Sequence, residues 1–111
     1  MNPKKFSPLT EASYYILISL ITPLHGYGVM KKVEELSTGR VKLAPGTLYG
    51  ALSNLQTSGL ITSGEGTDNR KKKMYKITLP GLSLAEYEIK RLQEMAHNGK
   101  TLLQNRQRSS I

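Results

Sequence analysis

The stretch APGTLYGALSNLQTSGLI, residues 44–61, carries the signals that decide the fold. Pro45 suits the first turn of a helix, where its missing N–H has no partner to lose, and Gly59 is a typical C-terminal stop. These signals predict a helix from Pro45 to about Ser58. A leucine recurs at each turn, at positions i, i+4 and i+7, which predicts the buried face of this helix: Leu48, Leu52 and Leu55.

The outward face of this helix is small and polar and has no charge, although the chain has a formal net charge of +8. Its members are Thr47, Tyr49, Gly50, Ser53 and Asn54. Hydroxyl and amide groups can bond to base edges in a DNA groove, and glycine lets the backbone come close. Such a face is also typical of a helix that is only solvated, and Tyr49 could pack at the edge of the leucine stripe.

Two further helices are predicted before this stretch. Ser7 and Pro8 are expected to cap and open the first helix, which Pro23 ends. The second covers HGYGVMKKVEELS, residues 25–37, and Gly39 follows it as a stop. Its apolar stripe is formed by Val29, Met30, Val33 and Leu36. Residues 40–44 then form a short extended piece.

A β-hairpin is predicted after this stretch. Leu60 and Ile61 begin one strand, and KMYKITL, residues 73–79, forms the other, with a glycine-rich turn between them. Residues 70–76 include five Lys and Arg and no acid, so the tip of the hairpin is basic. Three short helices followed by such a hairpin predict a winged helix-turn-helix over residues 1–80.

Residues 81–111 predict a long C-terminal helix with a frayed tail. Its apolar and small residues recur at intervals of three and four, a seven-residue repeat that suits a partner helix. The predicted fold is therefore mainly α with a small β-hairpin, and the C-terminal helix is expected to form a homodimer. The expected dimer interface consists of Leu82, Ala85, Ile89, Leu92, Ala96, Gly99 and Leu103.

Composition limits the function further. The excess of positive charge indicates a polyanionic partner such as double-stranded DNA. The chain has no cysteine, and His25 and His97, its two histidines, are isolated loop or surface residues by this interpretation. We therefore expect no catalytic residue, metal ligand or cofactor. Without a sufficiently long apolar run or a signal segment, a cytoplasmic protein that does not enter a membrane is expected.

Three motifs resemble those of the PadR-like transcriptional regulators. LHGYGVMKKVEE is similar to the start of that family's second helix, and GTLYGALSNLQTSGLI is similar to its recognition helix. RKKKMYKITLPG is similar to its second wing strand, and the resemblance covers residues 9–103. It implies a winged helix-turn-helix repressor that binds a palindromic operator as a dimer and is often released by a small hydrophobic or phenolic effector.

The sequence departs from the family pattern at several positions. Ser53 and Asn54 stand where the family often has arginine, Met74 replaces an aromatic residue, and Arg70 stands in place of a glycine. The chain has no tryptophan, so an effector cannot be stacked on one. An effector pocket would use other side chains, for which we name Tyr87 and Met95.

The leading hypothesis is a homodimeric, sequence-specific DNA-binding regulator, most simply a repressor. The outward face of the third helix would enter the major groove, and basic residues of the wing and flank would hold phosphates: Lys42, Arg70, Lys71, Lys72 and Lys73. A winged-helix adaptor that binds a partner protein without specific DNA binding is the alternative. An effector sensor with weak DNA affinity differs from the first hypothesis only in emphasis.

Overall fold

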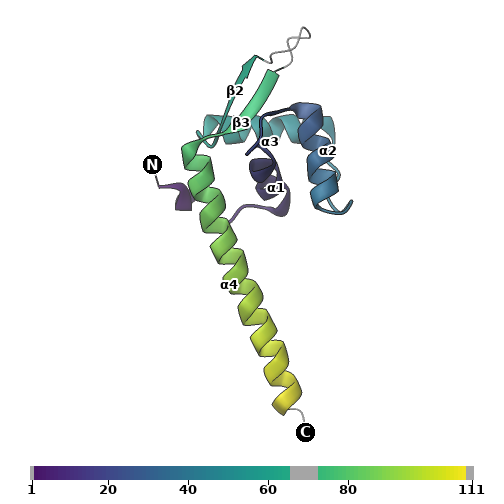
Figure 1. Ribbon diagram of the computed structural model, residues 1–111, viewed down its shortest axis with the longest axis vertical. Coiled ribbons are helices and arrows are strands. Elements are labelled where there is room, and N and C mark those ends of the chain that lie inside the picture. Colours follow the sequence, from purple (N-terminus) through teal and green to yellow (C-terminus); the bar gives the residue numbers. More distant parts are fainter. Residues whose placement is uncertain (1, 66–72, 110–111) are drawn as a thin grey trace.

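The computed structural model describes residues 2–65 and 73–109. A head built of short helices and a small sheet is followed by one long helix that leaves it, so the molecule is elongated, with extents of 67 × 33 × 21 Å (Figure 1). Along the chain the elements are η1 (Pro3–Phe6), α1 (Glu11–Ser19), β1 (Leu24–His25), α2 (Gly26–Leu36), α3 (Pro45–Thr57), β2 (Ile61–Glu65), β3 (Lys73–Ile77) and α4 (Leu79–Ser109).

The expected second and third helices are confirmed with their stops. α2 and α3 are each followed by a glycine in the left-handed region, Gly39 at φ 80° and Gly59 at φ 76°. The Gly39 N–H donates to the carbonyl of Glu34, and the carbonyl of Leu55 accepts from Leu60. These bonds satisfy carbonyl groups at the helix ends and require a backbone conformation that glycine adopts without strain.

The prediction for the first helix is wrong at both ends. α1 begins at Glu11 rather than at Ser7-Pro8, because Thr10 is its cap and the Ser7 hydroxyl donates to Glu88 instead. α1 ends at Ser19, four residues before Pro23. The helix stops early because the carbonyl of Leu20 accepts the Ile77 N–H of β3 at 2.8 Å.

The hairpin is confirmed, and it belongs to a three-stranded antiparallel sheet in the order β1-β3-β2. In the register of the hairpin, Ser63 faces Tyr75 and Glu65 faces Lys73. The third strand, β1, has only two residues and pairs through Leu24 with Tyr75. It was not predicted. Residues 40–44, which were expected to form a short extended piece, form no strand.

The core of the head lies where the three short helices, the sheet and the start of α4 meet. The leucine stripe of α3 contributes to it as predicted, and the buried apolar residues are Ile16, Leu17, Leu20, Val29, Val33, Leu48, Leu52, Leu55, Leu60, Ile61, Tyr75, Ile77, Leu84 and Ala85. Because α3 is held by residues on one side only, its other side is left free at the surface of the head.

The start of α4 is locked to the end of α3. The Thr78 hydroxyl donates to the carbonyl of Gly59 at 2.7 Å and accepts from the Gly81 N–H at 3.2 Å. A Cβ at Gly81 would collide with the carbonyl oxygen of Leu60, so only glycine allows this close approach. The expected long helix is confirmed, while the division of the chain at residue 80 stays a prediction.

Candidate nucleic-acid interface

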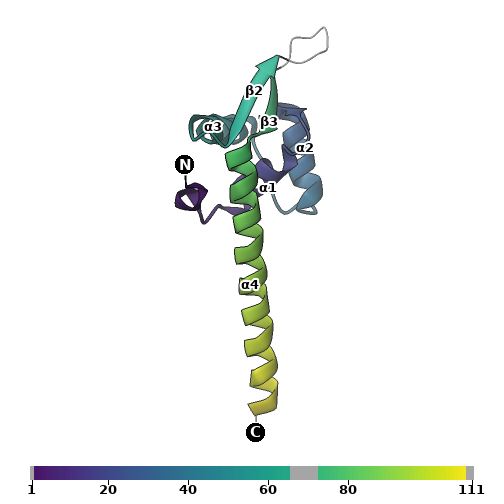
Figure 2. The ribbon, with the colours of Figure 1, turned by 60° about the vertical axis from the view of Figure 1, so that its left-hand side comes forward.

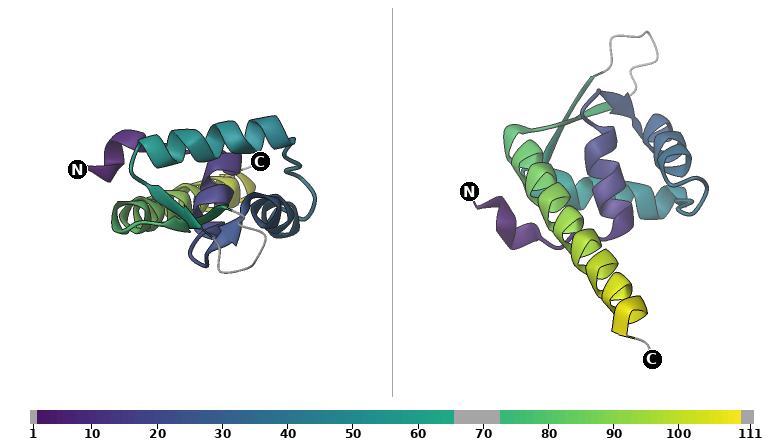
Figure 3. Two further views of the ribbon diagram at one scale, coloured as in Figure 1. Left: turned by 90° about the horizontal axis from the view of Figure 1, so that it is seen from above. Right: turned by 60° about the horizontal axis from the view of Figure 1, so that its bottom comes forward.

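All five residues predicted to read bases lie exposed on α3. Seen from above, α3 lies along one side of the head, at the upper edge of the picture, and α2 is viewed almost end-on at its right-hand end (Figure 3, left). Among residues 2–65 and 73–109, the side chains of Thr47, Ser53 and Asn54 make no hydrogen bond. Their donors and acceptors are therefore available to another molecule.

Gly50 lies at the centre of this exposed face. A rotation of about 100° per residue places it almost opposite the buried leucines of the same helix. A Cβ at Gly50 would meet nothing within 4 Å, and the same is true of Gly46 one turn earlier. Neither glycine is required by packing within the chain, so their small size instead leaves the helix backbone open to close approach.

Tyr49 differs from the other four because the head holds part of its side chain. Its ring lies over Gly26 at the start of α2, where a Cβ would collide with it, and about half of the side chain is exposed. Tyr75 of β3 is buried, which raises the pKa of its phenol. Tyr49 thus lies at the edge of the predicted reading face and packs against the start of α2, in agreement with its position beside the leucine stripe.

Two of the predicted phosphate contacts can be placed, and three cannot. Lys42 lies exposed between α2 and α3, with its Nζ 4.0 Å from a carboxylate oxygen of Glu34. Lys73 is exposed at the start of β3, and its Nζ lies 5.9 Å from the centroid of the Tyr75 ring. The remaining three lie outside the described residues: Arg70, Lys71 and Lys72.

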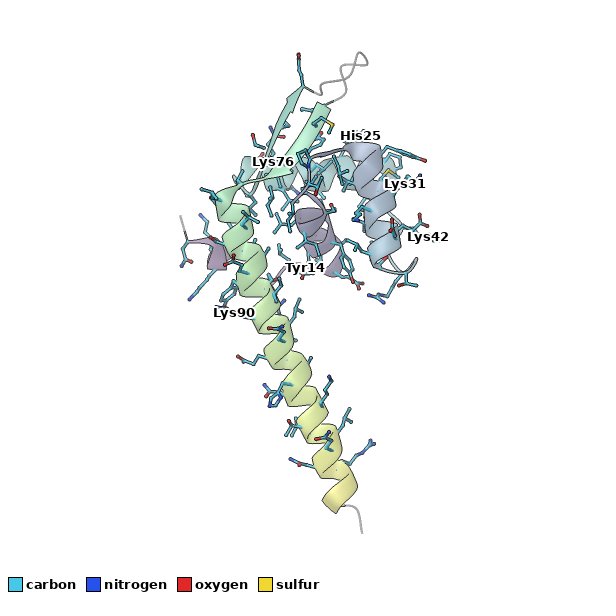
Figure 4. All side chains as sticks on the ribbon, viewed as in Figure 1. Tyr14, His25, Lys31, Lys42, Lys76 and Lys90 are labelled. Atoms are coloured by element: carbon cyan, nitrogen blue, oxygen red, sulfur yellow. The ribbon has the colours of Figure 1, made fainter. Side chains whose placement is uncertain are left out.

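The structure adds two lysines that the sequence interpretation left out. Lys76 is exposed on β3, and Lys31 is exposed on α2, with its Nζ 5.6 Å from the centroid of the Tyr27 ring. Figure 4 places Lys31 and Lys42 on the α2 side of the head and Lys76 beside the sheet. Positive charge therefore lies on both flanks of α3, where the sequence interpretation had named the run at the wing and Lys42.

His25 is a helix cap rather than an isolated surface residue. Its Nδ1 accepts from the Gly28 N–H at 3.2 Å, and its ring stacks on Tyr27 with 6.5 Å between centroids. This arrangement fixes the start of α2 beside the Tyr49 ring. Within the described ranges there is no group of histidine and acidic residues that could hold a metal ion, and none of the helices there is long and apolar enough to cross a membrane.

The residues predicted for the dimer interface fall into two groups. Leu82 and Ala85 pack against the core of their own head. The other five are exposed: Ile89, Leu92, Ala96, Gly99 and Leu103. Met95 and Leu102 are also exposed and widen this apolar stripe, and in Figure 2 the second half of α4 stands clear of the head.

A hollow of about 290 Å³ lies between α1 and α4, at the point where the exposed stripe begins. It is lined by Leu9, Glu11, Tyr14, Tyr15, Glu88, Arg91 and Leu92. Tyr87 and Met95, the residues named for an effector pocket, are not among its walls. Tyr87 instead lies beside the N-terminal segment, with the Nζ of Lys4 5.4 Å from its ring centroid.

Glu88, at the side of this hollow, is a buried carboxylate that the sequence interpretation missed. It is 1% exposed and accepts hydrogen bonds from Ser7, Leu9 and Arg91. The Arg91 guanidinium, together with the donors of Ser7 and Leu9, lowers the pKa of this carboxyl to about 2 against the opposing effect of burial. Glutamate at a helical position gives no sequence signal of such a role.

Three short helices, a three-stranded sheet with a hairpin and a long terminal helix define a winged helix-turn-helix protein. Residues 16–86 match the Transcriptional regulator PadR-like family. The chain therefore belongs to this family and is a transcriptional regulator.

One relative agrees with this assignment by its name, and a second is similar in sequence. The chain is 33% identical over 64 residues to the Transcriptional regulator Rv3488 of Mycobacterium tuberculosis, a match that covers 57% of this chain and 60% of the relative. It is 34% identical over 79 residues to an uncharacterized 37.1 kDa protein in transposon TN4556 of Streptomyces fradiae, covering 70% of this chain. That match covers 22% of the relative, so the chain spans less than two thirds of either protein.

The fold also matches that of a solved structure. A PadR family transcription regulator from Clostridium difficile R20291 has a TM-score of 0.72 and 22% identity, with 85% of this chain and 99% of that chain covered. At this level of identity the similarity concerns the fold, which confirms the mainly α winged helix with a long C-terminal helix.

Proposed function

We propose that this regulator is a homodimeric, sequence-specific DNA-binding repressor whose α3 reads an operator in the major groove. The observation that carries the proposal is the outward face of α3, whose polar groups have no partner among the described residues and whose two glycines leave room around the backbone. Side chains of this kind pair with base edges, and Asn54 can bond an adenine through two hydrogen bonds.

The position of the lysines supports contact with both DNA strands. Lys76 flanks α3 on the sheet side, and Lys73 lies on the same strand, β3. Lys31 and Lys42 flank α3 on the α2 side. Lysines at such positions bind phosphates and supply affinity that does not depend on sequence. In this proposal the uncharged face provides the sequence preference, and the flanking charges provide most of the strength and the salt dependence.

The exposed stripe of α4 supports a dimer through this helix. Ile89, Leu92, Met95, Leu102 and Leu103 form a wider stripe than the seam of two isolated helices requires, which suits a helix packed against more than one neighbour. We infer that the partner α4 covers this stripe and reaches the hollow beside α1. The two recognition helices would then lie about 34 Å apart, for half-sites roughly 10 bp apart.

The same hollow is our candidate for an effector site. Tyr14, Tyr15 and Leu92 give it aromatic and apolar walls, and its volume of about 290 Å³ suits a small aromatic molecule. It replaces Tyr87 and Met95 as the proposed site. An effector bound there would be detected as a ligand-induced change in affinity for the operator.

Selection of bound duplexes from a random library at two salt concentrations tests the proposal. We expect enrichment of an inverted repeat whose half-sites are one helical turn apart. Asn54→Ala should then lose preference at one or two base pairs, at a cost of about 1–3 kcal/mol, whereas Asn98→Ala, an exposed asparagine on α4, should lose none. Equal weakening of Asn54→Ala on operator and random DNA would refute the groove assignment. No salt-dependent binding to any duplex would favour the adaptor alternative.

A further inference from the structure

The head holds α4 only along the first part of this helix. Leu84 and Ala85 are buried in the core, and Glu88 is the last buried residue along the helix in the described part of the chain. The roughly 20 residues that follow extend for about 30 Å at about 1.5 Å per residue. A change of about 10° in the direction of α4 at Glu88 would therefore move the far end of this helix by about 5 Å relative to the head.

At this point the carboxylate of Glu88 joins α4 to the N-terminal segment. Its Oε2 accepts from the Ser7 hydroxyl at 2.6 Å and from Arg91 Nε at 2.7 Å. Its Oε1 accepts from the Leu9 N–H at 2.6 Å and from Arg91 Nη2 at 3.2 Å. Two donors thus come from a segment about 80 positions earlier in the chain, and two come from the next turn of α4 itself.

The N-terminal segment lies alongside α4 at the same level. η1 and α4 are side by side in both Figure 1 and Figure 2, and Lys4 lies over the ring of Tyr87. Phe6 and Leu9 pack against the core of the head. The segment is therefore bound to the head by its apolar side chains and to α4 by Glu88. It thus links the two at Glu88, where α4 leaves the head, a point that we call the junction.

A buried carboxylate is a poor way to gain stability at such a position. An apolar side chain of similar volume would serve equally well or better, because removing the charge from water is costly. Hydrogen bonds differ from apolar contacts in being directional. The two from Ser7 and Leu9 therefore restrict the rotation and tilt of α4 more than an apolar contact would, and the two from Arg91 hold the carboxylate in position to accept them.

We propose that Glu88 is a positioning residue that fixes the direction of α4 relative to the head, and so sets the separation of the two recognition helices in the dimer. The claim about the separation of the recognition helices, the second half, rests on the proposed function. The claim about the direction of α4, the first half, concerns one chain and can be tested without DNA.

Distances between spin labels on the head and on α4 test the first half. The chain has no cysteine, so labels can be attached at Gln56→Cys on α3 and Lys100→Cys on α4, both exposed. Labelled protein diluted with an excess of unlabelled protein reports the distance within one chain. We expect Glu88→Gln and Ser7→Ala to shift or broaden this distance distribution by several ångströms. Ser7→Thr, which keeps a hydroxyl, should retain the original distribution.

Glu35→Ala is the matched control, because it removes an exposed carboxylate of α2 that does not line the hollow between α1 and α4. It should leave the distances unchanged. If Glu88→Gln does not fold, Ser7→Ala alone decides, since it removes one hydroxyl at a half-buried site. Distributions for Ser7→Ala and a folded Glu88→Gln that match the original one would overturn the proposal.

Operators with altered spacing test the second half. Duplexes that carry the same half-sites at centre-to-centre separations of 8–13 bp would be titrated with each variant, a range chosen around one helical turn of about 10 bp. The original protein should favour one separation, and Ser7→Ala should lower its preference over the adjacent separations at least threefold while binding to an isolated half-site is unchanged. Unaltered spacing preference would overturn this half. An original protein that favours no separation would refute the proposed dimeric operator, and the label distances would still decide the role of Glu88.

Discussion

Replacing Gly50 by alanine should stabilise the protein and weaken its binding to DNA. A methyl group at this position would meet nothing within 4 Å in the chain, and Gly50 has the ordinary backbone of a helix. Alanine in a helix interior is favoured over glycine by about 0.8–1.0 kcal/mol. Since no packing opposes that gain, the variant should unfold at a temperature about 3–4 °C higher, for an unfolding entropy of about 2.1 cal/mol/K per residue.

The effect on DNA binding should have the opposite sign. Gly50 lies at the centre of the exposed face of α3, so a groove that approaches this face closely must accommodate the added methyl. Overpacking at a close contact costs about 1–3 kcal/mol. This corresponds to an operator affinity that is about 5- to 150-fold lower.

Thermal unfolding at fixed protein concentration and titration of the selected operator would measure the two effects on one sample. Gln56→Ala, on the edge of the same helix, is the control for a general effect of alanine on α3 and should change operator affinity little. A Gly50→Ala variant that is stabilised but binds the operator with unchanged affinity would refute close approach at this face. A destabilised variant would refute the open space around Gly50.

The remaining predictions concern the wing, the start of α4 and the buried carboxylate. Lys73→Ala should weaken binding to all duplexes alike and reduce the slope of log affinity against log salt by about 1, while Lys90→Ala on α4 should leave the slope unchanged. Gly81→Ala should destabilise the fold by more than about 1 kcal/mol in chemical denaturation, because its Cβ would strike the carbonyl of Leu60; a gain in stability would contradict that contact. Folding lowers the pKa of Glu88 from 4.5 to about 2, so its contribution to stability should be complete above pH 4.5 and be lost as the pH falls towards 2. Measured across this range, the free energy of unfolding should fall less steeply for Glu88→Gln than for the original protein.

Local patterns in the sequence predicted most of the fold. The leucine spacing of α3 and the glycine stops at Gly39 and Gly59 depend on residues a few positions apart, and both are confirmed. The exposed polar face of α3 follows from the same spacing, because the side of a helix that is not buried is known once the buried side is known. Whether this face reads bases is not determined by that geometry and stays a prediction.

Errors arose where contacts distant in the sequence decide the structure. α1 ends early because Leu20 bonds to Ile77 of β3, and β1 exists only because two residues pair with that strand. The start of α1 is displaced because Ser7, a residue that commonly caps helices, donates to Glu88 instead. No periodicity or turn signal in the first 25 residues carries information on partners more than 50 positions later.

Glu88 also shows why the predicted dimer seam was only partly interpretable from its heptad spacing. α4 packs against its own head for about three turns and then leaves it. Its apolar residues therefore form two successive groups, although both groups follow the same seven-residue repeat. Leu82 and Ala85 belong to the first group, and Leu92 belongs to the second. The period continues through the junction because the helix is continuous, whereas the packing against the head ends there. Glu88 lies at that change and is buried among hydrogen-bond donors rather than apolar side chains, so the junction is held by directional bonds at the point where the apolar contacts within the chain end.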